Sequence, residues 1–165
     1  MRAFRKLGRM VGSKPMNAEK RLADAGLKLP EPPLAGGNYV SAKTIGVLVY
    51  LAGVISADES GLITGTVGID RTLDEAYAAA RACSLTQLAV LRSHLGSLDA
   101  VREIVSVNGY VNAVAGFADS PKVINGASDL LVEIFGEAGR HVRAAIGVSS
   151  LPKNALVEVQ MVVAI

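Results

Sequence analysis

Residues 156–165 limit the possible folds of this chain more strongly than any other segment, because their side chains fall into two alternating sets. One set is purely apolar: Val157, Val159, Met161, Val163 and Ile165. A period of two is typical of a pleated strand. The other set begins with Glu158 and Gln160 and then turns apolar. The segment is therefore predicted to be a strand with one face in the core.

The segment before it predicts a second strand, on which Arg143, Ala145 and Gly147 share a face. The linker SSLPKNA carries the Ser, Pro and Asn typical of a turn. We therefore expect a hairpin, in a register that sets Arg143 opposite Glu158. Two charges among Ala, Gly and Val are costly unless they face each other or a ligand. This pair is the first candidate for chemistry.

Capping signals predict three helices. Asn17 precedes a short helix over 18–25 that Gly26 ends. Thr72 and Glu75 have the spacing of a capping box, and the helix they open ends at Gly96. Ser120 followed by proline opens another helix, which runs to residue 135.

The strands complete an α+β architecture. The run 45–55 is rich in β-branched and aliphatic residues, too uniform for an edge strand with one solvent-exposed face. Gly53 within it indicates either a close backbone approach or a bulge. Residues 101–114 alternate as a further strand. The order of elements predicts a mixed sheet with two helices packed on one face. The other face would be free to meet neighbouring subunits.

Half of the 165 residues are apolar, yet no apolar run is long enough to span a bilayer. We therefore expect no membrane association, and assign the apolar excess to an oligomer interface.

Charge divides the chain in two. The first fifteen residues hold five of the seventeen basic residues and no acid, so the remaining 150 carry a net charge of −3. Residues 1–15 are predicted to be a basic flexible leader, and 16–165 a single domain. An acidic body disfavours nucleic-acid binding.

Cys83 is the only cysteine, which suits a cytoplasmic location and favours an inert core thiol.

Several kinds of site are disfavoured by the sequence. His94 and His141 are far apart and lack partners at ligand spacing, so no metal site is expected. No Ser-His-Asp or Cys-His set can be assembled, and the phosphate-binding glycine motifs are absent. Tyr39, at the start of the first strand, either reaches a ligand or simply packs.

The closing segment resembles the reactive intermediate deaminase family (RidA, YjgF or L-PSP endoribonuclease), whose signature is an arginine, a strand and then a Leu-Pro motif with a downstream glutamate. Here these are Arg143, Leu151-Pro152 and Glu158. Further matches are Asn38-Tyr39, Gly53, Gly96-Ser97-Leu98-Asp99 and Asn125. The pattern spans roughly residues 16–165.

The resemblance implies a chorismate-mutase-like domain (bacillary type) that forms a homotrimer with pockets between subunits. It implies hydrolysis of 2-imino or enamine acids to 2-keto acids and ammonia, without a cofactor or a metal. Arg143 would bind the substrate carboxylate and Glu158 would orient the water. Tyr39, Gly53, Asn125 and Ala145 would line the pocket.

The chain departs from the family pattern at two pocket positions. Ala52 stands where the family commonly has a serine, and Ala145 stands where many members have a cysteine. An alternative function is therefore a non-catalytic ligand-binding or interaction trimer of the same fold. RNA cleavage is a third interpretation. For Arg143 and Glu158 the alternative role is an interface salt bridge.

Overall fold

The structure is a computed structural model that describes residues 17–165. The predicted leader 1–15, and its boundary with a domain beginning at residue 16, lie outside these residues. The helices are α1 (Ala18–Asp24), α2 (Leu73–Leu95) and α3 (Ser120–Phe135), with short 3₁₀ turns η1 (Leu98–Ala100), η2 (Gly136–Gly139) and η3 (Pro152–Asn154). The strands are β1 (Ala42–Ile45), β2 (Leu48–Leu51), β3 (Val54–Ile55), β4 (Ala57–Asp58), β5 (Gly61–Leu62), β6 (Glu103–Asn112), β7 (Val142–Val148) and β8 (Val157–Ala164).

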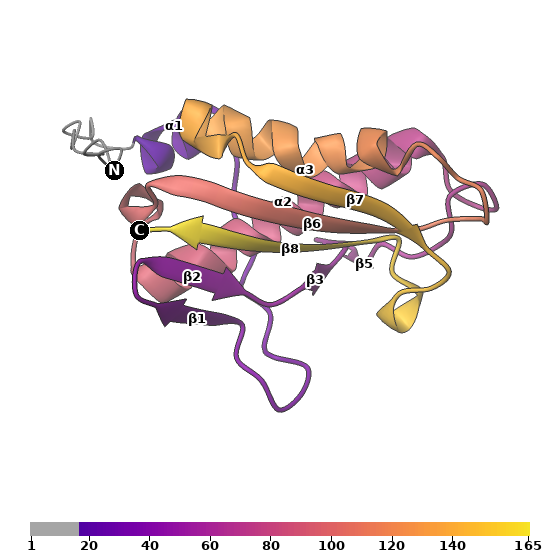
Figure 1. The fold of residues 1–165 in the computed structure, drawn as a ribbon, viewed down its shortest axis with the longest axis horizontal. Helices are drawn as coiled ribbons and strands as arrows, with labels where there is room; N and C mark the ends of the chain where they lie inside the picture. The colour runs from indigo at the N-terminus through magenta and orange to yellow at the C-terminus, as the bar shows by residue number, and fades with distance from the viewer. Residues whose placement is uncertain (1–16) are drawn as a thin grey trace, which may run out of the picture.

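The main sheet has the order β1-β2-β8-β6-β7, and β3 also pairs with β8 (Figure 1). Only β6 and β7 run parallel; the other pairs in this sheet are antiparallel. The predicted mixed sheet is confirmed. As predicted, one face of β8 is buried, with the alternate residues half-buried. β4 and β5 form a separate small hairpin.

The predicted hairpin of the last two strands is wrong, because β6 lies between β7 and β8 (Figure 1). Arg143 pairs with Val107 of β6, and Glu158 pairs with Tyr110 of the same strand. The physical reason is the crossover through α3, which returns the chain parallel to β6 and beside it. The linker with turn residues then passes the end of β6 instead of closing a tight turn.

The run 45–55 is also not one inner strand. Gly46 adopts a left-handed φ of +62° and turns β1 back onto β2, with Ile45 opposite Leu48. β1 is an edge strand, and Ile45 and Val47 are 59% and 64% exposed. A second break at Ala52 and Gly53 separates β2 from β3. The prediction failed because the apolar pattern of this run does not reveal that the chain turns at Gly46 and breaks again at Gly53.

Both long helices cover the same face of the sheet, as predicted. Their inner residues form one core with the buried side of β8, including Leu88, Leu91, Leu130 and Val159. Cys83 is part of this core, and burial raises the pKa of its thiol, which agrees with the predicted inert role. Within the described residues, no helix combines the length and hydrophobicity needed to span a bilayer.

None of the helices formed by residues 17–165 covers the opposite face of the sheet. Val49 and Val163 face each other in the core, so their neighbours Tyr50 and Val162 point to the open face. Tyr50 is 44% exposed there. On β7, Ile146 is 50% exposed on the side opposite to Arg143. An apolar surface of this kind is typical of a subunit interface.

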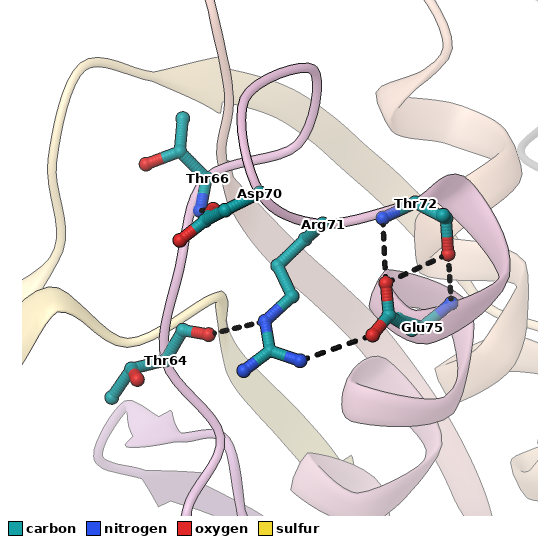
Figure 2. A network of polar contacts seen from close by, with 6 residues as sticks. All are labelled: Thr64, Thr66, Asp70, Arg71, Thr72 and Glu75. Carbon is teal, nitrogen blue, oxygen red and sulfur yellow. Dashed lines mark hydrogen bonds and ion pairs between the residues drawn. The ribbon is translucent and has the colours of Figure 1, made fainter.

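A polar network holds the loop that leads into α2 (Figure 2). Thr72 and Glu75 form the predicted capping box, and Glu75 also accepts from Arg71 at 3.0 Å. Arg71 Nε donates to the Thr64 carbonyl at 2.7 Å, and Thr66 N donates to Asp70 at 2.6 Å. These hydrogen bonds join loop residues to one another and to the first turn of α2. The network therefore fixes the loop against the start of α2.

Candidate functional site

The guanidinium of Arg143 on β7 is held by α3. Its Nη1 donates to Asn125 Oδ1 at 2.8 Å and to Ser128 Oγ at 3.0 Å, and its Nη2 donates to the Pro121 carbonyl at 3.2 Å. Asn125 and Ser128 are three residues apart and therefore share one helix face. The crossover lays this face beside the edge strand. We call these four residues the arginine cluster.

The cluster leaves one edge of the guanidinium free. Three of its five N–H groups are bonded as described. Within residues 17–165, no acceptor is bound to Nε–H or to the second N–H of Nη2. Nε and Nη2 share one edge of the planar group, and such an edge matches the two oxygens of a carboxylate. The cluster therefore keeps donors for a carboxylate on this edge, while both N–H groups of Nη1 are used.

Ala145 lies two residues beyond Arg143 on the same face of β7. Its side chain is half-buried and packs against the core. It offers only a methyl group, so this position supplies no nucleophile or proton donor.

Glu158 lies on β8 and points to the open face of the sheet, because its neighbours Val157 and Val159 are fully buried on the helix side. Its carboxylate lies against the backbone at Gly53: a Cβ atom there would be 2.1 Å from Glu158 Oε1. The carboxyl is half-buried, and this burial raises its pKa. A carboxylate with a raised pKa is a stronger base.

A cavity of about 860 Å³ adjoins Glu158 and Gly53. Its other walls come from the connector 28–39, from β3, β4, β5 and α2, and from Pro152 and Lys153. Tyr39 is in the connector, and its hydroxyl accepts from Gly36 N at 3.1 Å, which leaves the phenolic proton for a ligand. We call this cavity the glutamate pocket.

Two buried polar side chains support the glutamate pocket and were not predicted. Gln87 on α2 donates to the carbonyls of Ala52 and Val159, at 2.9 and 2.7 Å, where the sheet divides between β2 and β3. Ser56 donates to the Ile63 carbonyl at 2.7 Å and accepts from two backbone N–H groups of 156–157. Its hydroxyl donates one hydrogen bond and accepts two, so it has no bond left for a ligand. It therefore does not replace the pocket serine that the family commonly has where this chain has Ala52. In the sequence, the feature that could have predicted the role of Gln87 is its place among the apolar residues of the helix.

The predicted site residues therefore form two separate groups. Asn125, Arg143 and Ala145 lie together on the helix side of β7, while Tyr39, Gly53 and Glu158 lie together at the glutamate pocket. Arg143 and Glu158 are two strands apart, three residues out of register, and on opposite faces. At strand spacing, their Cα atoms are about 14 Å apart. Within one chain, they cannot bind the same small ligand.

A profile of the family described as "YjgF/chorismate mutase-like, putative endoribonuclease" matches residues 19–165. The chain belongs to this YjgF family. It is 41% identical over 140 residues to Protein TCP17 of Trypanosoma cruzi, covering 84% of this chain and 88% of that one. A Shewanella oneidensis structure, described as a putative endoribonuclease, has a TM-score of 0.86 at 37% identity over 90% of this chain and 99% of that chain.

The predicted family is thus confirmed. A YjgF-family structure called RidA, from Psychrobacter sp., matches with a TM-score of 0.55 at 26% identity, covering 82% of this chain and 94% of that one. The predicted chorismate-mutase-like α+β fold is confirmed with it.

Proposed function

We propose that this YjgF-family protein hydrolyses 2-imino acids to 2-keto acids and ammonia, at a site built from two copies of the chain. The arginine cluster of one copy binds the substrate carboxylate. The glutamate pocket of the next copy holds the reacting carbon and the water.

The observation that carries the proposal is the separation of the two groups within one chain. Each has half of the required chemistry: a guanidinium with a free bidentate edge, and a carboxylate that burial makes more basic. Each lies at a surface that a neighbouring copy can reach, since Arg143 is on an edge strand and Glu158 points to the open face.

The two groups supply the elements of an imine hydrolysis. Arg143 orients the substrate through its carboxylate, and Glu158 accepts a proton as the water oxygen bonds to C2 of the protonated imine. Glu158 passes this proton to the amine nitrogen of the addition intermediate. As the C–N bond then breaks and ammonia leaves, Glu158 accepts the remaining hydroxyl proton and the C=O bond of the 2-keto acid forms.

A cyclic homotrimer fits this arrangement. In a head-to-tail ring, each interface joins one surface of a copy to a different surface of the next. Exposed apolar side chains are available to pack at such interfaces: Tyr50, Val142 and Ile146 are 44%, 71% and 50% exposed.

The second candidate is an oligomer that binds a carboxylate ligand without turning it over. Ala145 and the engaged hydroxyl of Ser56 favour it, because neither adds a reactive group to the pocket. RNA cleavage, which the description of the Shewanella relative names, ranks third, because residues 16–165 carry a net charge of −3.

The test is a subunit-mixing experiment with Arg143→Ala and Glu158→Gln. Wild type should accelerate the hydrolysis of 2-iminopropanoate and 2-iminobutanoate, made in place by an amino-acid oxidase, and each variant alone should be inactive. Random mixing in equal amounts should restore about a quarter of wild-type activity, since each site needs an intact arginine from one copy and an intact glutamate from the next.

The outcomes separate the candidates. Recovery in mixed oligomers, verified by native mass spectrometry, supports a shared site. An active wild type without recovery would reject it. A wild type that is folded and oligomeric but does not accelerate hydrolysis would leave ligand binding as the function.

A further inference from the structure

His141 lies just before β7, two residues from Arg143, and its half-buried ring makes two hydrogen bonds. Nδ1 is 2.7 Å from the Gly139 carbonyl, and Nε2 is 3.0 Å from Ser128 Oγ. Ser128 is also the residue whose oxygen accepts from Arg143 Nη1 at 3.0 Å. One hydroxyl therefore connects the imidazole to the guanidinium.

The partners determine the direction of these bonds. A carbonyl can only accept, so Nδ1 of His141 carries the proton and donates to Gly139. In the neutral ring, Nε2 is then an acceptor, and the hydroxyl of Ser128 donates to it. The lone pairs of Ser128 Oγ remain for Arg143. The bonds run in one direction, from Arg143 through Ser128 and His141 to Gly139.

We propose that His141, acting through Ser128, is a positioning residue that fixes the Arg143 guanidinium with its Nε–Nη2 edge toward the substrate carboxylate. The inference rests on the proposed role of Arg143 as the carboxylate-binding residue.

The need for this support follows from the place of Arg143. Its long side chain projects from an edge strand, and no strand of residues 17–165 lies beyond it to restrict its rotamers. Asn125 Oδ1 and the Pro121 carbonyl, both on α3, each accept a hydrogen bond from one N–H group of the guanidinium. Ser128 holds the third, and its hydroxyl is itself directed by His141. Without that direction, the guanidinium could rotate and present another pair of donors.

The protonation state of His141 matters for this arrangement. Burial lowers the pKa of His141 below its ordinary value of 6.5; the hydrogen bond to the Gly139 carbonyl opposes this shift, and the positive charge of Arg143 adds to it. Arg143 is the charged side chain that faces the ring from β7. Nearby on η2 and just after it, Glu137 and Arg140 pair with each other at 3.1 Å, and Asp129 on α3 accepts from Tyr77 at 2.8 Å.

Protonation would reverse the bond to Ser128. Nε2 would then donate to Ser128 Oγ and put a second cation beside the guanidinium. We therefore expect carboxylate binding to weaken as the pH falls below the folded-state pKa of His141.

The experiment measures Arg143 itself as well as ligand binding. The ¹⁵N heteronuclear NOE of the Arg143 Nε–H group reports how firmly the side chain is held, and titration with 2-oxobutanoate gives Kd. His141→Phe should lower the NOE and weaken binding by about 5-fold to 10-fold, with kcat for the imine little changed. Ser128→Ala should likewise lower the NOE and weaken binding of 2-oxobutanoate, which covers the case in which His141→Phe folds poorly.

Two further variants sharpen the result. In His141→Gln, the amide oxygen can accept from Ser128, so binding should be kept while its dependence on acidic pH disappears. His94→Phe is the matched control, because the other histidine bonds to Thr44 at 2.8 Å, away from the arginine cluster, and should change neither readout.

An Arg143 NOE that is unchanged in both His141→Phe and Ser128→Ala would overturn the inference, whatever the enzyme assays show. Failure of the proposed function looks different: wild type would neither hydrolyse imines nor bind 2-oxobutanoate, while the NOE would still decide whether His141 positions Arg143.

Discussion

Gly53 and Glu158 approach each other so closely that the position of a Cβ atom on Gly53 is only 2.1 Å from Glu158 Oε1 and 3.1 Å from its Cδ. Gly53 is not among the residues with positive φ, so its backbone does not require glycine. Space requires it. The missing side chain lets the carboxylate lie against the break between β2 and β3.

The first prediction is that Gly53→Ala strongly lowers kcat by moving Glu158. The new methyl group would displace the carboxylate by an ångström or more, and a displacement of this size costs about 100-fold in kcat. Steady-state kinetics of 2-iminobutanoate hydrolysis would measure the loss.

Gly46→Ala is the control for this prediction. Gly46 has open space around its Cβ position but a φ of +62°, so alanine there should cost about 1 kcal/mol of stability and leave kcat unchanged. Wild-type kcat in Gly53→Ala would show that Glu158 does not need its present position.

The second prediction concerns Glu158→Gln, which should raise Tm at pH 8 while it abolishes hydrolysis. Burial raises the pKa of Glu158, so the folded state disfavours the charged carboxylate, and stability is lost as the pH rises above the ordinary value of 4.5 through the higher folded value. The neutral amide avoids this cost. The difference in Tm should shrink at pH 4, where the wild-type carboxyl is protonated. Calorimetry at the two pH values tests it, and an equal difference at both would contradict it.

The third prediction is that Gln87→Leu lowers the free energy of unfolding by about 2–3 kcal/mol, because the buried carbonyls of Ala52 and Val159 lose their donor. It should also reduce activity, since Ala52 adjoins Gly53. Denaturant unfolding at one protein concentration gives the free energy.

Gln160→Leu makes the same chemical change on the half-buried face of β8 and should cost no more than about 0.5 kcal/mol. A similar loss in the two variants would argue against a specific role for Gln87.

The fourth prediction compares two helix starts. Thr72→Ala should cost about 1 kcal/mol, because the side chain of Thr72 accepts from Glu75 N and Glu75 bonds back. Asn17→Ala should cost almost nothing, since Asn17 makes no side-chain cap bond in α1. Thermal unfolding of the two variants checks this, and equal losses would reject the difference between the caps.

Glu75 adds a pH signature to the same comparison. The hydrogen bonds from Thr72, backbone first, lower the pKa of Glu75 below 4.5. Its contribution to stability is therefore present above pH 4.5 and is lost as the pH falls through the lower folded value. The Tm deficit of Thr72→Ala should accordingly diminish in acid.

Helices and single strands were predictable because their signals are local. The capping box at Thr72, the proline after Ser120 and the alternation in 156–165 each act over a few residues, and α2, α3 and β8 lie where these signals place them. Gly53 was predicted to mark a close approach or a bulge, and the structure has the close approach. The individual site residues came from the family resemblance together with the charges of Arg143 and Glu158.

The prediction failed where distant segments had to be placed. Nothing within 140–165 shows that β6 inserts between β7 and β8, because strand pairing depends on hydrogen bonds to a segment more than thirty residues earlier. Gln87 and Ser128 were missed for a related reason: each acts on groups from other elements.

The sequence alone determined the α+β class, the core faces of the helices and of β8, and the residue types available for chemistry. Only the tertiary structure decided that Arg143 and Glu158 lie two strands apart and on opposite faces. The physical reason is that side-chain period specifies which face of an element is apolar, whereas strand order depends on long-range closure of the whole sheet.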